Sequence, residues 1–522
     1  MAGFAAAAPV FAATNEIGPG HRPETRYPPG PKQIVLHLRS RNARTGEAEV
    51  IDEAISPAKV GIIVVDVWDY HWCKTCAARL TAMIPRMNCA LEGARKLGCQ
   101  VIFAPTDCVP FYRESPQRKA VIRLPDVPPP PSQTPIVMPG CPVGGDPCGP
   151  GIECILNYGE NSMHPDLKIE REDLISDGAG ELYKVCKAKE LTHLIYAGIA
   201  TNICVIGKPE AVRTMLSFGL KCYLSRDLTD AFGHPPQQAQ DVSVAHVEKH
   251  ACPSVDVIET LKENGFWNEA RQVEPVLLSP WGKKERPYFF ETTATVFLEQ
   301  PRLKDVEIRY TLDGSEPTPA SSFYDKPITL SDTSSLRAMA FHRGQPAGLP
   351  SEAYYVKLPP VPPRPSVRLF DLLPLKEKTG WAQNERRIPA RAYNMRMRGK
   401  DYRKGLCLHA PAEMTYQLKP EYERFVAEAG VDDSVLALNA GRYLGAFPTV
   451  TFQVHIDSKL MASSPIMRVS ETPWRFDVEI PKGSKTIQLV VTDAGDGSRM
   501  DIANWCNSGF VISNYKGWEP SP

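Results

Sequence analysis

Several features are missing from this sequence of 522 residues, and each absence excludes a class of protein. No charge of one sign dominates, because 60 lysines and arginines balance 60 aspartates and glutamates, so the global charge gives no reason to expect a nucleic-acid partner. No apolar run approaches the ~20 residues that a membrane-spanning helix needs. The 14 cysteines include no CxxC…CxxC pattern typical of a zinc site. We therefore expect a globular protein of roughly three or four domains.

The N-terminus does not identify the compartment. Residues 1–32 are rich in Ala, Gly and Pro and lack the basic stretch that begins a signal peptide, so they are expected to be a disordered leader or a signal remnant. Twelve cysteines lie between Cys73 and Cys252, and this clustering fits either reduced thiols or a few local disulfides. With the accessory domains described below, a secreted, periplasmic or cell-surface location is favoured over a cytoplasmic one.

Residues 33–280 alternate predicted strands with predicted helices. This alternation predicts a three-layer α/β domain with a parallel sheet. The expected strands are 60–66, 100–104, 167–170, 194–197 and 221–225, and the expected helices are 80–97, 181–189 and one that carries His246 and His250. Residues 111–164 lack periodicity and contain four consecutive prolines, so we expect a long surface insertion that shapes the substrate pocket.

The cysteines of this region allow several interpretations. Cys141, Cys148 and Cys154 could form a local disulfide or hold a metal, and the disulfide is favoured because the spacing is not that of a zinc site. Cys73 and Cys76 form a single CxxC on a predicted helix, which is expected to be incidental.

The second half of the chain has short alternating strands separated by turn residues. Residues 281–358 predict a small β-sandwich, and residues 366–522 predict a larger one. Between them, residues 359–365 are too rich in proline to continue a strand ladder. We expect a stiff spacer there, with the two sandwiches separable at this point. The fold class is thus multidomain, an α/β domain followed by two all-β sandwiches.

Cys204 is the candidate nucleophile. It follows an apolar strand and the tight turn Gly198-Ile-Ala-Thr, and it precedes apolar residues at helical spacing. Free N–H groups and the positive end of a helix dipole favour a thiolate at such a position. The alternative is a buried structural cysteine.

The first domain resembles the isochorismatase-like cysteine hydrolases. The resemblance rests on Asp66 at the end of the first strand, on the signature Gly198-x-x-Thr-x-x-Cys-Val205, and on the step Arg226-Asp227 after the following strand. It implies that Asp66 is the base for the Cys204 thiol, which attacks a carbonyl in an amide or related C–N bond.

The same resemblance implies further features of the nucleophile turn. The backbone N–H groups of Cys204 and Ala200, in the turn that contains Thr201, would hold the oxyanion. The bond between Ile199 and Ala200 is where the family has a cis peptide.

Two departures from the family affect the predicted site. Family members carry a triad lysine, and matching the distance to the helix at Leu182 places Arg171 there, with Lys168 three residues earlier; alternatively, both are solvent-facing charges. Arginine keeps the charge but cannot shuttle a proton near neutral pH. The Asp-x-His metal motif is absent because Cys108-Val109 follows Asp107, so no metal is expected.

The expected substrate pocket includes Asp107 and two residues after the Asp66 strand. His71 and Trp72 are placed to line it, although His71 could equally be an ordinary polar residue of a loop.

Residues 289–357 resemble the C-terminal module of chitobiases and β-hexosaminidases. The core of the resemblance is Ile308-Arg-Tyr-Thr-Leu-Asp-Gly-Ser-Glu-Pro317. It identifies an accessory fold and no chemistry.

Residues 366–515 resemble NPCBM modules, which implies a carbohydrate-binding domain. The matching segments are 405–411, 425–433 and 490–497, together with Asp501 and Trp505. Calcium could bind the acidic loops at Asp432/Asp433 and Asp493/Asp496, which could equally be turn aspartates. Trp381, Trp474 and Trp505 could stack on sugars or be buried.

These expectations combine into one functional hypothesis and two rivals. The hypothesis is a cysteine-dependent hydrolase of a small-molecule amide or related C–N bond, without a cofactor, carrying a glycan-binding domain and able to form a homo-oligomer through the hydrolase domain. The first rival is a catalytically degenerate hydrolase fold that serves as a carbohydrate-binding or cell-surface interaction protein. In the second rival the sandwiches bind protein.

Overall fold

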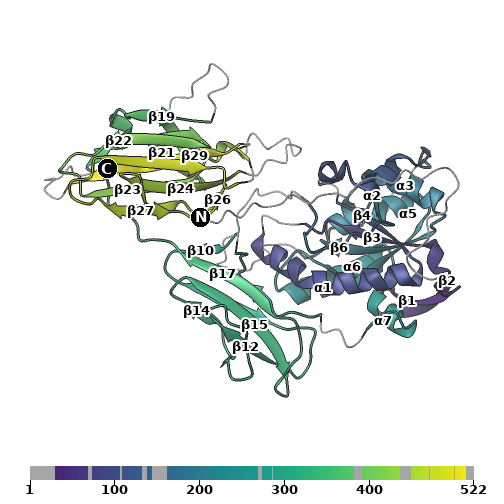
Figure 1. Ribbon diagram of the computed structural model, residues 1–522. Coiled ribbons are helices and arrows are strands. Elements are labelled where there is room, and N and C mark those ends of the chain that lie inside the picture. Colours follow the sequence, from purple (N-terminus) through teal and green to yellow (C-terminus); the bar gives the residue numbers. More distant parts are fainter. Residues whose placement is uncertain are drawn as a thin grey trace.

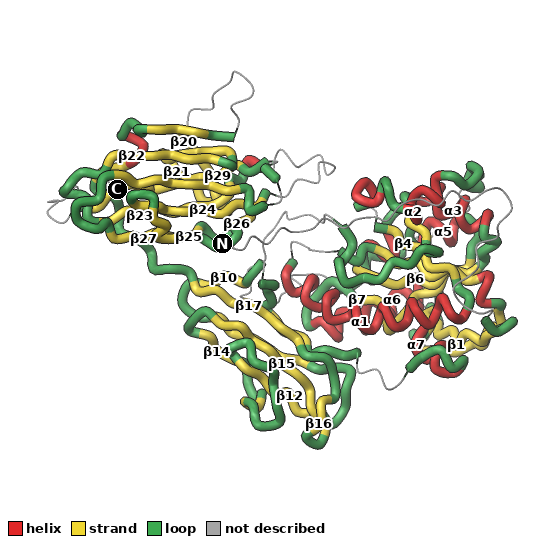
Figure 2. Tube along the Cα trace, viewed as in Figure 1, coloured by secondary structure: helices red, strands yellow, loops and turns green. Residues whose placement is uncertain are grey.

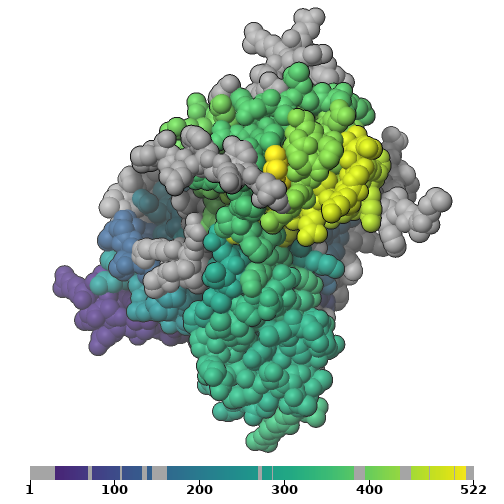
Figure 3. Space-filling view, turned by 90° about the vertical axis from the view of Figure 1, so that its left-hand side faces the viewer, coloured from purple at the N-terminus to yellow at the C-terminus, as the bar shows by residue number. Residues whose placement is uncertain are grey.

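The computed structural model describes most of the chain, as an α/β domain and two β-sandwiches (Figure 1). The described residues are 30–68, 73–105, 108–131, 138–143, 162–268, 273–284, 286–380, 391–435, 448–469, 471–495, 497–498 and 500–512. None of the helices in this part of the chain is long and apolar enough to span a membrane. In Figure 3 the middle module (teal) projects below the C-terminal sandwich (green to yellow), and the α/β domain (purple to blue) lies behind them.

Within the described residues, the α/β domain is built on an eight-stranded sheet in the order β2-β1-β8-β7-β6-β3-β4-β5. Its strands are β1 (Ile34–Arg41), β2 (Ala48–Ile55), β3 (Val60–Val65), β4 (Gln100–Ala104), β5 (Leu174–Ile175), β6 (His193–Ile199), β7 (Lys221–Asp230) and β8 (Ser254–Val255). The strands from β8 to β5 pair in parallel, whereas β1 and β2 form an antiparallel hairpin at one edge. The sheet is therefore mixed, and not parallel throughout as predicted. The hairpin escaped prediction because β2 is almost wholly exposed and has no buried apolar run.

Helices cover both faces of this sheet (Figures 1 and 2). Alternate residues of β3 point to opposite faces, so Ile62 and Val64 pack with α1 (Lys74–Leu97) and α7 (Val257–Glu263). Ile63 and Val65 pack on the other face. The helices of that face are α2 (Pro116–Ile122), α3 (Gly178–Ala188), α4 (Cys204–Gly207), α5 (Val212–Ser217) and α6 (Pro236–His250). Two 3₁₀ turns, η1 (Pro57–Lys59) and η2 (Val109–Tyr112), complete the domain.

Two local predictions in this domain were wrong. Residues 167–170 lie in a loop, and the strand beside β4 is the short β5. The predicted insertion 111–164 contains the end of η2 and the whole of α2, and Arg118 of α2 pairs with Glu181 of α3. Because that ion pair and the buried Val121 hold α2 against the domain, the first part of the insertion belongs to the fold.

The predicted local disulfide is not formed at Cys141. This residue carries a free thiol whose Sγ lies 3.7 Å from Ser243 Oγ. Cys148 and Cys154 lie outside the described residues.

The middle module packs two sheets around an apolar core. One sheet has the order β10-β17-β15-β12-β13, with β16 beside β15, and the other has the order β14-β11-β9. The strands are β9 (Leu277–Ser279), β10 (Tyr288–Phe290), β11 (Ala294–Glu299), β12 (Glu307–Thr311), β13 (Ser322–Phe323), β14 (Ile328–Leu330), β15 (Ser334–His342), β16 (Gln345–Pro346) and β17 (Ser351–Lys357). The alternating burial of β11 is typical of a strand with one face in a core.

The C-terminal module is a larger sandwich of the same kind. Its sheets have the orders β20-β21-β29-β23-β27, with β18 beside β29, and β19-β22-β28-β24-β25, with β26 beside β24. The elements are β18 (Val367–Arg368), η3 (Leu369–Asp371), β19 (Lys376–Lys378), β20 (Arg391–Met397), β21 (Lys400–His409), β22 (Ala412–Gln417), β23 (Arg424–Val431), β24 (Thr449–Ile456), β25 (Lys459–Ser463), β26 (Met467–Arg468), β27 (Trp474–Glu479), β28 (Thr486–Thr492) and β29 (Ile502–Val511). Both predicted sandwiches are thus present.

Specific contacts join the three parts. Ala77 and Ala78 of α1 belong to the apolar core of the middle module, together with Trp281. The middle and C-terminal modules meet where the Phe289 and Trp474 rings pack edge to face, 6.4 Å between centroids. The middle module is therefore packed on α1.

Gly198 determines how closely β6 approaches β3. A Cβ at this position would lie 1.9 Å from the Val65 carbonyl oxygen, and the residue has φ 103°. We expect Gly198→Ala to destabilise the α/β domain by more than about 4 kcal/mol, because two backbone segments would have to separate. Gly219 also has positive φ but meets no atom within 4 Å, so Gly219→Ala should cost only about 1–2 kcal/mol. Urea unfolding of both variants measures the difference, and equal midpoints would refute the close-packing argument.

Candidate active site

The site lies at the carboxyl edge of the sheet, where β3 and β6 end side by side. Asp66 directly follows β3, is 3% exposed and adopts φ 47°, a left-handed conformation that costs free energy for a residue with a side chain. The peptide between Ile199 and Ala200 at the end of β6 is cis, as the family resemblance implied. Because β3 and β6 pair in parallel, their ends bring Asp66 next to the turn that carries Cys204.

Hydrogen bonds to the end of β7 hold the nucleophile turn. The Thr201 N–H donates to the Asp230 carbonyl at 2.9 Å, and the Thr201 hydroxyl donates to Gln240 at 2.8 Å. Asn202 donates to the Phe232 carbonyl at 2.8 Å. Thr201 is fully buried, and these two bonds give it a structural role in the turn.

Cys204 begins α4 and is partly exposed. Its thiol donates a hydrogen bond to the Asp66 carboxylate, and the Ala200 backbone N–H faces its sulfur. Burial and the Asp66 charge raise the pKa of the thiol to about 12. The expectation of a resting thiolate was therefore wrong. Its physical basis is missing as well, because α4 has only four residues and ends at Gly207, so the helix dipole is small.

Lys208 supplies the positive charge at this site. Its Nζ lies 3.2 Å from Asp66 Oδ2, and the lysine side chain is 19% exposed. Its charge also lowers the pKa of the Cys204 thiol, against the effects of burial and of Asp66. The sequence analysis missed this residue although a signal existed: Lys208 lies four positions after Cys204, a spacing that places two side chains on one face of a helix.

The two cations predicted for this role lie elsewhere. Lys168 and Arg171 are exposed and precede β5, so they sit at the amino edge of the sheet, opposite Asp66 and Cys204. The prediction placed them at a carboxyl edge because it assumed a strand at 167–170. The residues that actually follow β5 are Ser176 and Asp177, neither of which is cationic.

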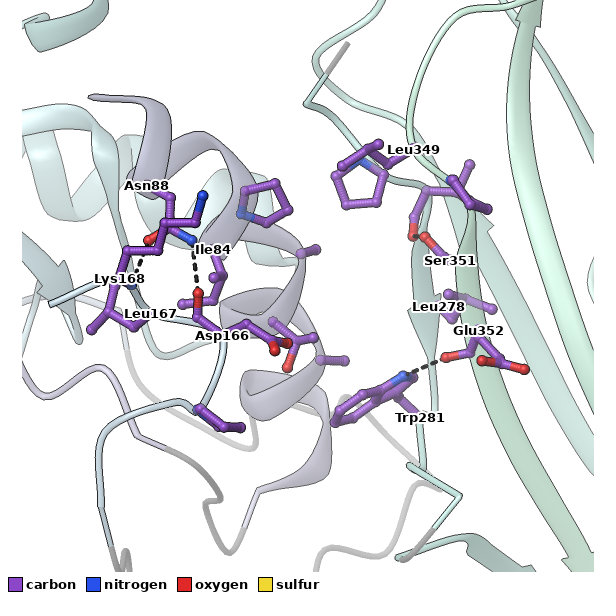
Figure 4. A pocket seen from close by; sticks show the side chains of 18 residues that line it. Ile84, Asn88, Asp166, Leu167, Lys168, Leu278, Trp281, Leu349, Ser351 and Glu352 are labelled. Carbon is purple, nitrogen blue, oxygen red and sulfur yellow. Dashed lines mark hydrogen bonds between the residues drawn. The ribbon is translucent and has the colours of Figure 1, made fainter. Parts of the chain in front are cut away.

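Figure 4 shows the surroundings of Lys168. The residue lines a cavity of about 740 Å³ between α1 and the middle module, and Trp281 lies on the module side. The Lys168 N–H donates to Asn88 Oδ1 at 2.9 Å, and Asn88 lies about 21 Å along α1 from Lys74. The geometry thus separates Lys168 from the thiol.

Three further residues were predicted to line the pocket, namely His71, Trp72 and Asp107, and they lie outside the described residues. Asp227 of the family-like Arg226-Asp227 step has a structural role, because its carboxylate accepts the N–H groups of Val257 and Ile258 at the start of α7.

The aspartates of the acidic loop at 432–433 stabilise the backbone of the C-terminal module. Asp433 accepts the backbone N–H groups of Arg398 at 2.9 Å and Gly399 at 2.7 Å, and Asp432 accepts bonds from Ser434 and Asn504. Asp496 lies outside the described residues. Among the residues that the structure describes, no cluster of three or more His, Cys, Asp or Glu side chains could hold a metal ion.

The candidate sugar-stacking tryptophans have other surroundings. Trp505 is fully buried between Phe425, Phe452 and Phe476, and Trp474 packs on Phe289 of the middle module. Trp381 lies outside the described residues.

Comparisons with known proteins assign the two sandwiches. Residues 288–351 match the chitobiase/β-hexosaminidase C-terminal domain, and residues 366–511 match the NPCBM/NEW2 domain. No curated protein matches the chain.

Similar solved structures are of two kinds. A CBM51 from Clostridium perfringens GH95 in complex with methyl-galactose is 24% identical, covering 28% of this chain and 99% of its own, with a TM-score of 0.23. An isochorismatase family protein from Burkholderia thailandensis is 14% identical, covering 40% of this chain and 97% of its own, with a TM-score of 0.25. YcaC from Pseudomonas aeruginosa, with hexane-2,5-diol and covalent acrylamide, is 13% identical over 40% of this chain and 81% of its own, with a TM-score of 0.25. The assigned part of the chain thus consists of a chitobiase-type C-terminal domain followed by an NPCBM domain.

Proposed function

We propose that the α/β domain is a cysteine-dependent hydrolase that cleaves an amide or related C–N bond of a small molecule. One observation supports this above all: a carboxylate, a thiol and an ammonium group converge at the carboxyl edge of the sheet, in Asp66, Cys204 and Lys208. A base beside a nucleophile and a cation beside both are the components of covalent acyl transfer.

The first step is proton transfer from Cys204 to Asp66. The thiol already donates a hydrogen bond to this carboxylate, so the proton has a short path. The raised pKa of the thiol means that the thiolate forms only as the reaction proceeds. Lys208 offsets part of the free-energy cost of forming the thiolate. Its ammonium group stabilises the negative charge both on Asp66 and on Cys204.

The thiolate then attacks the carbonyl carbon, and the carbonyl oxygen becomes an oxyanion. The Ala200 N–H, which faces the sulfur, and the Cys204 N–H are the two proposed donors to this oxygen. Asp66, now protonated, returns its proton to the leaving nitrogen. Water, deprotonated by Asp66, hydrolyses the thioester and regenerates Cys204.

The rival hypothesis of a degenerate, non-catalytic fold loses its main argument. It rested on a missing triad lysine, and Lys208 provides an ammonium group at 3.2 Å from Asp66. Lysine, unlike arginine, can also release a proton when its pKa is lowered.

For the C-terminal module we propose glycan binding. The match of residues 366–511 to the NPCBM/NEW2 domain supports it. A hydrolase carried by such a domain would act at a polysaccharide or cell surface, so we propose a secreted, periplasmic or cell-surface location.

Alkylation of Cys204 tests the electrostatics of the site. Because Lys208 lowers the pKa of the thiol, Lys208→Ala should slow its reaction with iodoacetamide about tenfold near pH 8, whereas Lys168→Ala should not change it. In the unmodified protein the rate should rise about tenfold per pH unit from pH 7 to 10, since the pKa is about 12. Peptide mapping gives each rate, with the buried Cys99 as a slower internal reference. A plateau below about pH 9 or equal effects of the two lysine variants would contradict this charge arrangement.

Hydrolysis of small amides, carbamoyl compounds and ureido compounds tests the activity. Asp66→Asn and Cys204→Ala should each lower kcat by at least about 10³-fold, because one removes the base and the other the nucleophile. Lys168→Ala is the control and should retain full activity. Ammonia or amine release measures turnover, and thermal unfolding confirms that each variant folds. If Cys204→Ala keeps its activity, or if the folded protein cleaves no member of the three classes, the hydrolase proposal fails.

A glycan array tests the accessory module. The full chain should bind at least one class of glycan, and a chain that ends at Leu358 should lose this binding, because it lacks the NPCBM domain. Retained binding by the shortened chain would place the glycan site elsewhere. Absence of binding by the full chain would favour the rival in which the sandwiches contact protein.

A further inference from the structure

Cys73 and Cys76 form a thiol pair at the start of α1, separate from Cys204. Cys73 is the N-cap residue, and its Sγ accepts the Cys76 backbone N–H at 3.4 Å. The two thiols also hydrogen-bond to each other, and neither cysteine is part of a disulfide in this structure. The CxxC spacing therefore brings the two sulfur atoms together in the structure.

The backbone allows these sulfurs to be joined. Side chains three positions apart on a helix lie about 5–6 Å apart at Cβ, and an N-cap side chain folds back over the third residue of its helix. Disulfides span Cα separations of about 4.4–6.8 Å, a range that such a pair meets without movement of the helix. A disulfide between Cys73 and Cys76 therefore needs little more than rotation about the side-chain bonds of the two cysteines.

The pair is connected to the candidate active site through Arg79. Arg79 is the residue one turn after Cys76, and its guanidinium forms an ion pair with Asp230. The Asp230 carbonyl accepts the Thr201 N–H of the nucleophile turn. The beginning of α1 also packs on the middle module through Ala77 and Ala78. A covalent link at the beginning of α1 would thus act on a segment that supports both the turn and the module.

We propose that Cys73 and Cys76 are a redox-active dithiol that closes to a disulfide when a low-molecular-weight disulfide is the oxidant. One cysteine, as the thiolate, attacks the oxidant, forms a mixed disulfide and releases one thiolate. The second cysteine loses its proton and attacks the mixed disulfide, which releases the second thiolate. Two electrons pass from the cysteine pair to the oxidant, whose two halves leave as thiols.

The surroundings predict the character of this disulfide. The Cys73 thiol and burial raise the pKa of Cys76, whereas Arg79 lowers it. Because the thiolate form is not stabilised, closure should be slow and the disulfide, once formed, should resist reduction. Burial of both residues acts in the same direction by limiting access.

Mass spectrometry of the full-length protein tests the proposal without reference to hydrolase activity. The protein is equilibrated in buffers of reduced and oxidised glutathione, quenched in acid, unfolded, alkylated and digested with trypsin. Trypsin cleaves after Lys74, between the two cysteines, so a disulfide links the peptides 60–74 and 75–79. We expect this linked pair, about 2 Da lighter than the sum of the two free peptides, to increase with the oxidised fraction.

Matched variants identify the partners. Cys73→Ser keeps a helix-capping oxygen and should abolish the linked peptide, whereas Cys99→Ser should leave it unchanged. Alkylation of both cysteines at every glutathione ratio would overturn the proposal, as would linkage of either one to a third cysteine. If the variants fail to fold, the unmodified protein still decides the question, because the linked peptide either forms or does not.

Discussion

The parallel contact between the ends of β3 and β6 is the constraint on which the candidate site depends. Gly198 has no side chain, and only for this reason can β6 come so close to the Val65 carbonyl. Asp66 directly follows Val65, the last residue of β3, and the turn after β6 leads to Cys204. Parallel pairing places both at the same edge, so the carboxylate and the thiol meet although 138 residues separate them in sequence.

This proximity determines the electrostatics of the site. A carboxylate beside a partly buried thiol opposes ionisation of the thiol and raises its pKa, while the same carboxylate is the natural acceptor of its proton. The Lys208 ammonium group lowers the free-energy cost of placing the Asp66 carboxylate beside the Cys204 thiol. The site therefore has the charge balance of a base-activated nucleophile and differs from one that keeps a stable thiolate.

The accessory modules are more closely integrated than a linear order of domains suggests. α1 packs its apolar face on the sheet and contributes Ala77 and Ala78 to the core of the middle module. At the other end of that module, Arg475 of β27 donates to the Pro359 carbonyl at 3.2 Å and pairs with Glu291 at 2.7 Å. Arg475 thus holds the start of the proline-rich spacer and also links the C-terminal sandwich to the middle module.

The sequence by itself determined the class of each domain, the turn that carries Cys204 and the aspartate at the end of β3. These features depend on local patterns: continuous apolar runs for buried strands, alternation for the sandwiches, and a glycine-led turn before Cys204. The family matches of residues 288–351 and 366–511 confirm the two modules that these local patterns predicted.

Only the tertiary structure decided which cation lies beside Asp66 and Cys204. A two-residue β5 has too weak a pattern to locate from sequence, and an error in its position moved Lys168 and Arg171 to the wrong edge of the sheet. The surroundings of Trp505 and Trp474 and the paired thiols of Cys73 and Cys76 likewise depend on packing between distant segments, which no local pattern encodes.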